Sequence, residues 1–159
     1  MAEDKIAIYP GTFDPITDGH LDIIQRGLKI FDNIIIAVAE NPKKTLFSSK
    51  QRVDMIKEST KDLNLQVESF GNLLADYAKQ KNCKIIIRGL RAISDFEHEF
   101  QLASINAKLN PDLETIFVMT SEKHSFLSSS AVKEVASLKG DVSSLVPKTV
   151  EEKLREKFS

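Results

Sequence analysis

Residues 33–39 read Asn-Ile-Ile-Ile-Ala-Val-Ala, a continuous apolar run without the alternation of a strand that has one face in water. Such a run is typical of a β-strand covered on both faces, and strands of this kind occur mainly in parallel sheets between layers of helices. Shorter runs of strand character lie at residues 5–9, 65–70, 84–88 and 114–119. The sequence therefore predicts an α/β fold.

Between these strands the apolar residues recur at helical spacing. The predicted helices cover residues 21–31, a segment after Ser49 that carries Val53 and Ile56, residues 73–78, 96–107 and 130–138, and a last segment from Pro147 that carries Val150, Leu154 and Phe158. Ser49 is the expected N-cap of the second helix, and Gly140 is the expected C-cap after residue 138. The order β-α-β-α-β-α-β-α-β-α-α predicts a single Rossmann-like domain over residues 1–159, with a five-stranded parallel sheet and helices on both faces.

The composition excludes several classes of protein. The chain has 159 residues, 22 basic and 23 acidic side chains and a net charge of −1, which argues against bulk binding of nucleic acid or of an anionic membrane. Its one cysteine, Cys83, excludes an internal disulfide and a cysteine-based zinc site. The first five residues do not resemble a signal peptide, and no apolar run is long enough to span a membrane, so we expect a cytoplasmic protein.

Ligands of parallel α/β sheets bind beyond the carboxyl ends of the strands, and four loops there carry reactive side chains. The first loop follows residues 5–9 and reads Tyr-Pro-Gly-Thr-Phe-Asp-Pro, then Thr-Asp-Gly-His at residues 17–20. Thr17 is a good N-cap, which places His20 in the first turn of a helix whose free N–H groups attract phosphate. The alternative interpretation is a turn, a cap and a surface histidine.

The second loop, Asn-Pro-Lys-Lys at residues 41–44, follows the strand at 33–39. A lysine at this edge can bind phosphate as a mobile point charge. Lys43 and Lys44 can equally be a solvated pair, because such charges are usually exposed.

The third loop places Arg88 and Arg91 at the end of a buried strand. Two guanidinium groups there can bind phosphates in a bidentate manner. They can equally form ion pairs with the acidic residues that open the next helix, which are Asp95, Glu97 and Glu99.

The fourth loop, residues 124–130, ends in Ser128, Ser129 and Ser130 at the start of a helix. Their hydroxyl and N–H groups suit an anion; the alternative interpretation is one N-cap serine and two further serines without a ligand. Because all four loops lie on one predicted edge of the sheet, we expect them to form one site whose natural ligand is a polyphosphate.

Several of these segments also match known signatures. Residues 17–20 fit the T-x-G-H form of the H-x-G-H signature of nucleotidylyltransferases, and residues 127–134 fit their I-S-S-S-x-V-K-E signature with Leu127 in place of Ile. With the motifs at 9–15, 41–44, 87–91 and 95–99, the chain resembles the bacterial phosphopantetheine adenylyltransferases over nearly its whole length. It departs from them in His124, where that family usually has Trp, in Asn72, where some members have Asp, and in a loop at 41–47 that is one residue short.

The resemblance implies transfer of AMP from ATP to 4′-phosphopantetheine, with Mg²⁺ as cofactor, a homohexameric assembly and coenzyme A as a candidate feedback ligand. It implies catalytic roles for His20, Lys44 and Arg91, with Lys44 rather than Lys43 as the phosphate lysine, and no metal ligand from the chain. The implied ATP-binding residues are Thr12, Phe13, His20, Gly89, Leu90, Arg91, Glu99, His124, Ser125, Phe126, Leu127, Ser128, Ser129 and Ser130. The implied acceptor-binding residues are Thr12, Lys44, Leu74 and Arg88. Two alternatives stay open: a small nucleotidylyltransferase that uses CTP or another acceptor, and a non-catalytic module that senses ATP or coenzyme A.

Overall fold

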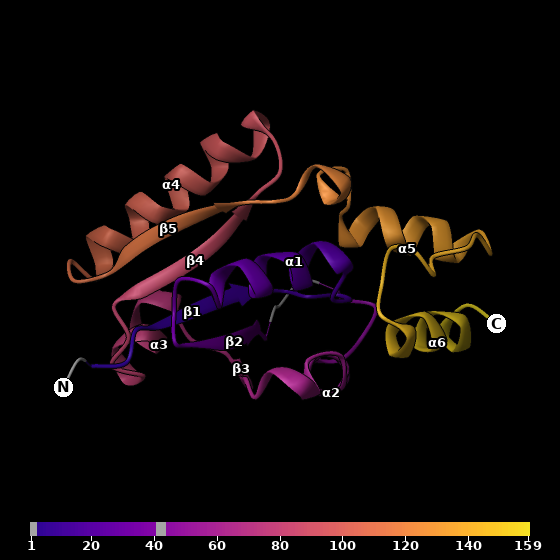
Figure 1. Ribbon diagram of the computed structural model, residues 1–159, viewed down its shortest axis with the longest axis horizontal. Coiled ribbons are helices and arrows are strands. Elements are labelled where there is room, and N and C mark those ends of the chain that lie inside the picture. The colour runs from indigo at the N-terminus through magenta and orange to yellow at the C-terminus, as the bar shows by residue number, and fades with distance from the viewer. Residues whose placement is uncertain (1–2, 41–43) are drawn as a thin grey trace.

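The computed structural model describes residues 3–40 and 44–159, and its centre is a parallel sheet (Figure 1). The strands are β1 (Ile6–Gly11), β2 (Asn33–Ala39), β3 (Gln66–Phe70), β4 (Ile85–Leu90) and β5 (Glu114–Met119). They form a 5-stranded sheet in the order β3-β2-β1-β4-β5, and each neighbouring pair is parallel. The predicted sheet is therefore confirmed, and the strand order reverses beside β1.

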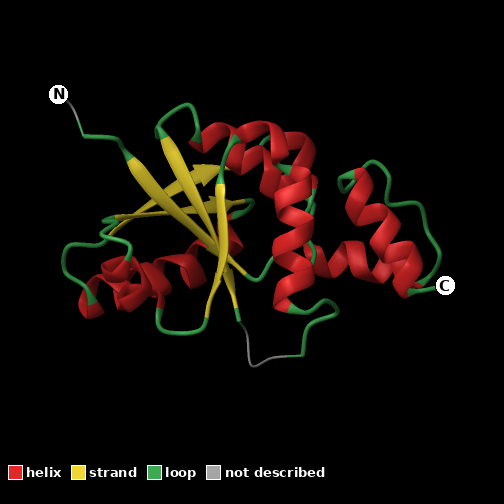
Figure 2. Ribbon diagram, turned by 90° about the horizontal axis from the view of Figure 1, so that it is seen from below, coloured by secondary structure: helices red, strands yellow, loops and turns green. Residues whose placement is uncertain are grey.

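Helices lie on both sides of the strands (Figure 2). They are α1 (Asp18–Gly27), α2 (Ser49–Ser59), α3 (Leu74–Gln80), α4 (Ile93–Leu109), α5 (Ser129–Ser137) and α6 (Lys148–Lys157), with short 3₁₀ turns at Lys61–Leu63 and Glu122–His124. The last two helices, α5 and α6, lie together at one end of the molecule (Figure 1). Within the described ranges, no helix is both long and apolar enough to cross a membrane.

The strand β2 shows why its apolar run is continuous. Ile34, Ile36 and Val38 belong to a core that also contains buried side chains of α1, α2, α5 and α6. Ile35 and Ala37 point to the opposite face, into a second core that contains buried side chains of α3. Successive residues of a strand face opposite sides, so a strand between two cores needs an apolar residue at every position.

Several predicted helix boundaries are wrong. The helix predicted to reach residue 31 ends at Gly27, with Leu28 as its C-cap, and the C-cap of α5 is Leu138 rather than Gly140. The N-cap of α2 is Ser48 rather than Ser49, because only Ser48 has Gln51 three residues later to complete a capping box. After α5 the left-handed conformation falls on Lys139, with φ 62°, rather than on Gly140. Gly140 instead provides space, since a Cβ there would lie 2.6 Å from Cγ1 of Val135.

The helix α4 leaves much of its apolar surface uncovered. Glu99 is its only buried residue, and all of α4 lies within the described part of the chain. Its exposed apolar side chains are Ile93, Phe96, Phe100, Leu102, Ile105 and Leu109, and Ile116 and Met119 of the edge strand β5 are exposed as well. The predicted face that includes Phe96 and Phe100 therefore lies partly outside the core of this chain.

Candidate active site

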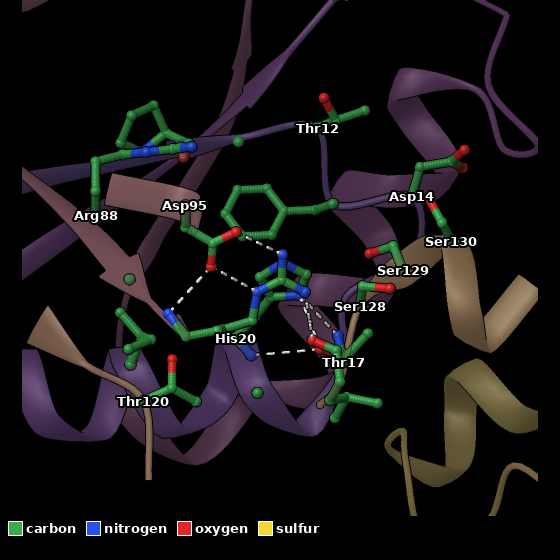
Figure 3. A pocket seen from close by; sticks show the side chains of 18 of the residues that line it. Thr12, Asp14, Thr17, His20, Arg88, Asp95, Thr120, Ser128, Ser129 and Ser130 are labelled. Carbon is green, nitrogen blue, oxygen red and sulfur yellow. Dashed lines mark hydrogen bonds and ion pairs between the residues drawn. The ribbon is translucent and has the colours of Figure 1, made fainter. Parts of the chain in front are cut away.

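The first, third and fourth predicted loops meet at one cavity of about 610 Å³ at the carboxyl edge of the sheet (Figure 3), and Lys44 of the second loop lines the same cavity. Its walls include most of the predicted site residues: Thr12, Phe13, His20, Lys44, Arg88, Gly89, Arg91, Glu99, Leu127, Ser128, Ser129 and Ser130. The walls come from segments far apart in the sequence. Parallel strands bring the loops after them to the same edge, which is where the strand order reverses.

The first helical turn of α1 fixes the orientation of His20. Thr17 is the N-cap, as predicted, and the two residues form a capping box. The amide of Thr17 donates to Nδ1 of His20 at 3.0 Å. Because Nδ1 accepts this hydrogen bond, the neutral imidazole carries its proton on Nε2 and can donate from there to a ligand.

The surroundings of His20 keep its imidazole neutral. Burial, reinforced by the positive charges of Arg88 and Arg91, lowers the pKa of His20 to about 4. The Phe13 ring packs against the imidazole with its centroid 4.9 Å away. Phe13 itself has φ 49°, a conformation that is rare for a bulky residue and costs of order 1–3 kcal/mol.

The Phe13 ring also lies close to the end of β1. A Cβ on Gly11 would lie 3.0 Å from Cε2 of Phe13, so a side chain at residue 11 would push the ring away. Gly11 therefore permits the packing of Phe13 on His20, and the first loop acts as one unit.

For Arg88 in β4, the sequence left open whether the guanidinium binds phosphate or pairs with an acidic residue. The structure shows such an ion pair and also leaves donors for a ligand. Arg88 pairs with Glu99 through Nε and Nη2 at 2.8 and 2.7 Å, and Nη1 donates to the carbonyl of Pro10 at 2.6 Å. Burial alone would lower the pKa of Arg88, but the ion pair with Glu99 raises it above its usual value. These contacts with described residues engage three of the five guanidinium N–H groups, which leaves two for a ligand.

Arg91 joins the third loop to the fourth. Its guanidinium contacts the Asp95 carboxylate at 3.3 and 3.4 Å, and Nη1 donates to the carbonyl of Leu127 at 2.9 Å. The ion-pair alternative is therefore realised with Asp95 rather than Glu97. The same contacts hold Arg91 beside the N-terminus of α5, so pairing with an acid does not remove it from the cavity wall.

The three serines at the start of α5 make different contacts. Ser128 is the N-cap and accepts from the amide of Ala131 at 3.1 Å. Ser129 donates to the carbonyl of Pro15 at 2.7 Å, which ties α5 to the loop after β1. Ser130 is exposed at the cavity. The N-termini of α1 and α5 thus open on the same cavity, as an anion site requires.

Lys44 lines the cavity and is exposed, whereas Asn41, Pro42 and Lys43 lie outside the described residues. The segment after Lys44 is held by Asp14, which accepts from the amides of Leu46 and Phe47 at 2.9 and 3.0 Å. Lys133 of α5 pairs with the same carboxylate at 2.9 Å. Burial favours the neutral form of Asp14, but these hydrogen bonds and Lys133 outweigh it and hold its pKa below the usual value.

Sequence reasoning had not assigned functions to Asp14 and Lys133, although both lie inside the matched motifs and line the cavity. It also missed Arg52, which belongs to no motif. Arg52 is 2% exposed and donates to the carbonyls of Thr12, Ala39 and Phe47. Nothing in the sequence around Arg52 indicates that its side chain is buried against main-chain carbonyls.

A second, smaller cavity of about 280 Å³ shares Thr12, Arg88 and Glu99 with the first. Its other walls are mostly apolar and include Leu74 and Leu102. Leu74 therefore lies apart from the main cavity, and the shared residues mark the place where a polar and an apolar compartment meet.

Four predicted nucleotide contacts do not line the main cavity in the described chain: Leu90, His124, Ser125 and Phe126. Phe126 is 68% exposed, and His124 ends the short turn beside the N-terminus of α1. Their roles stay predictions.

The donor groups do not form a protein-only site for Mg²⁺. Among the described residues, no group of three or more His, Cys, Asp or Glu side chains could hold a metal ion. The cavity carboxylates of Asp14, Glu99 and Asp95 are paired with Lys133, Arg88 and Arg91. Mg²⁺ is commonly bound through substrate phosphates with few protein ligands, so any ion here would belong to the nucleotide.

The fold and the site define a class of protein. Residues 8–135 match the Cytidylyltransferase-like family, and the chain is a nucleotidyltransferase. It is 58% identical over 154 residues to the phosphopantetheine adenylyltransferase of Dictyoglomus thermophilum, covering 96% of this chain and 94% of that protein. It is 56% identical over 156 residues to the same enzyme of Desulfosudis oleivorans, covering 97% of this chain and 93% of that protein. The chain belongs to the phosphopantetheine adenylyltransferase family.

A more distant structure shares the fold alone. A crystal structure described as a nicotinate-nucleotide adenylyltransferase from Vibrio parahaemolyticus superposes with a TM-score of 0.70 at 18% identity. The match covers 98% of this chain and 95% of that one. The Rossmann-like architecture is therefore confirmed independently of close sequence similarity.

Proposed function

We propose that this chain transfers AMP from ATP to 4′-phosphopantetheine, giving dephospho-coenzyme A and pyrophosphate. The observation that carries the proposal is the junction of the two cavities at Thr12 and Arg88. An acceptor phosphate at this junction would lie beside the polar cavity, which suits ATP. Its uncharged arm would extend into the apolar cavity past Leu74.

The reaction needs no covalent intermediate with the protein. An oxygen of the acceptor phosphate attacks the α-phosphorus of ATP, the new P–O bond forms, and the bond from the α-phosphorus to the bridging oxygen of the β-phosphate breaks. Pyrophosphate leaves with that electron pair. A phosphate dianion is already nucleophilic, so no general base is required, and the protein contributes positioning and electrostatic stabilisation.

The cationic groups then have distinct tasks. His20 donates from Nε2 to the ATP phosphates, and Arg91 stabilises the negative charge that develops on them. Lys44 bridges the acceptor phosphate and the α-phosphate, and Arg88 holds the acceptor phosphate with the two N–H groups that neither Glu99 nor the Pro10 carbonyl engages. Together they offset the repulsion between two anionic substrates. When Mg²⁺ accompanies ATP it neutralises further phosphate charge.

The remaining ATP contacts are proposed from the cavity wall. Thr12, Phe13 and Gly89 line it together with His20, and residues 127–130 line it at the start of α5. Coenzyme A carries the same pantetheine arm as the product, so we propose that it competes for both cavities as a feedback ligand.

Pyrophosphate release tests the proposal against its alternatives. We expect release from ATP only when 4′-phosphopantetheine is present, and none when CTP replaces ATP. Release with CTP, or with ATP and a different phosphorylated acceptor, would identify another small nucleotidylyltransferase. Binding of ATP without release under any of these conditions would identify a non-catalytic module.

We also propose that residues 1–159 act as one domain in the cytoplasm and assemble as a homohexamer. The exposed apolar side chains of α4 and β5 support an assembled state, because a large exposed apolar surface usually marks an interface. Size-exclusion chromatography with light scattering should give six times the chain mass of 17.8 kDa. A monomer mass at micromolar concentration would contradict it.

A further inference from the structure

The buried arginine of α2 connects three segments that surround the site. Nη1 of Arg52 donates to the carbonyl of Thr12 at 2.6 Å and to that of Ala39 at 3.0 Å, and Nε donates to the carbonyl of Phe47 at 3.2 Å. Thr12 lies in the loop after β1, Ala39 ends β2, and Phe47 lies just before α2. One guanidinium therefore spans the segments on which Thr12 and Lys44 are carried.

The charge of Arg52 makes its position unusual. Among the described residues it forms no ion pair within 4.0 Å, and its hydrogen-bond partners are neutral carbonyls. Burying a charge that no ion pair compensates is unfavourable, and burial lowers the pKa of Arg52 even though the nearby carboxylates of Asp14 and Glu40 act to raise it. A neutral side chain could fill the same space, so the fixed fork of donors is the property that distinguishes arginine here.

The Phe47 peptide is held from two sides. Arg52 donates to its carbonyl, and Asp14 accepts from its amide as well as from that of Leu46. Asp14 is 3% exposed and follows Thr12 in the same loop. Lys44 lies two residues before Leu46, so the main chain next to Lys44 is fixed by the contacts of Asp14 and Arg52.

We propose that Arg52 is a positioning residue that holds the segment of Lys44 against the loop of Thr12. It thereby sets the relative positions of the two groups on either side of the acceptor phosphate. The role rests on the proposed function, in which Thr12 and Lys44 contact that phosphate. Arg52 lines neither cavity, and its hydrogen bonds among the described residues go only to main-chain carbonyls, so it acts through the segments it holds rather than on the substrate.

The test uses Arg52→Lys, which keeps the charge but lacks the planar fork that reaches all three carbonyls. The matched control is Met55→Ala on the same helix, which removes a buried core side chain and leaves these carbonyl contacts intact. Both are compared with the unsubstituted protein at a temperature where thermal melts show every variant folded. The readouts are kcat, the KM for each substrate, and hydrogen exchange at the amides of Leu46 and Phe47.

We expect Arg52→Lys to lower kcat by about 10-fold while the KM for ATP changes by less than about 2-fold. In a Lys44→Ala background the same substitution should lower kcat by less than about 2-fold, because residues that act through one another are not additive. Exchange at Leu46 and Phe47 should accelerate in Arg52→Lys and not in Met55→Ala.

An unchanged kcat in Arg52→Lys, an equal loss in both backgrounds, or unchanged exchange at Leu46 and Phe47 would overturn the positioning role. The exchange measurement needs no substrate. If the unsubstituted protein failed to turn over ATP and 4′-phosphopantetheine, the proposed function would be wrong, and the exchange result would still decide whether Arg52 holds the segment.

Discussion

The amide of Thr17 donates to Nδ1 of His20 at 3.0 Å, and the amide of His20 returns a hydrogen bond to Oγ1 of Thr17 at 3.4 Å. The cap of α1 and the orientation of the imidazole are therefore one structural unit. Truncating His20 to alanine removes a donor from the cavity and a partner from the helix terminus at the same time.

The two roles of His20 can be separated by two variants. His20→Ala should lower kcat by at least about 10²-fold, a loss typical of removing one transition-state donor, and should destabilise the fold by about 1 kcal/mol because the Thr17 amide loses its acceptor. His20→Gln should lose activity similarly but retain stability, because a glutamine at this position can accept from the N-cap amide as Gln51 does in α2. Steady-state kinetics and urea denaturation measure the two effects. A folded His20→Ala with full activity would refute the assignment.

The depressed pKa of His20 predicts a pH dependence of stability. The unfolded histidine takes up a proton below about 6.5, whereas the folded one stays neutral until about 4. Between these values the unfolded state binds more protons, so stability falls as the pH is lowered, by at most about 1.4 kcal/mol per pH unit. Urea denaturation from pH 7 to 4 should show a smaller slope for His20→Gln than for the unsubstituted protein. Parallel slopes would show that His20 is protonated equally in both states.

The lysine that contacts phosphate can be identified by a matched pair. Lys44→Ala should lower kcat/KM for 4′-phosphopantetheine by about 10-fold or more, because a charge next to the transferred group is lost. Lys43→Ala should have the smaller effect in the same assay. The reverse order would show that Lys43 occupies the phosphate position.

The ion pair between Asp14 and Lys133 holds together α5 and the loop after β1. Asp14→Asn should destabilise the protein by about 2–4 kcal/mol, because an asparagine cannot accept from both amides and leaves Lys133 without its countercharge. Asp54→Asn, which breaks an exposed pair with Lys50, is the matched control and should cost less than about 0.5 kcal/mol. Equal losses in urea denaturation would mean that Asp14 does not brace the loop.

The apolar cavity can be tested at adjacent positions. Leu74→Gln should raise the KM for 4′-phosphopantetheine by about 10-fold, because a polar group replaces a wall of the compartment that would hold the arm, while the KM for ATP stays unchanged. Leu73→Gln changes an exposed neighbour that is outside both cavities and should leave both constants unchanged. A rise in the KM for ATP instead would show that ATP, and not the pantetheine arm, occupies the apolar cavity.

Much of the architecture could be predicted from the order of apolar residues. The uninterrupted run at 33–39 required cover on both faces, and the alternation of strand and helix patterns then required a parallel sheet. Thr17 was correctly expected as a cap because capping depends on neighbouring residues. The choice between Ser48 and Ser49 and the left-handed Lys139 were missed, because each depends on which of two adjacent residues meets a particular local partner.

Periodicity and motif spacing are local properties, and they were enough to predict the fold class, the family and the edge of the sheet at which the candidate site lies. The contacts of each charged group could be read only from the folded chain. Arg88 pairs with Glu99, Arg91 donates to the carbonyl of Leu127, and Arg52 donates to the carbonyl of Thr12. These contacts join residues that lie 11 to 40 positions apart in the chain, and they depend on how strands and helices pack in three dimensions. The same packing partly buries His20 near Arg88 and Arg91 and so lowers its pKa, which no local pattern records.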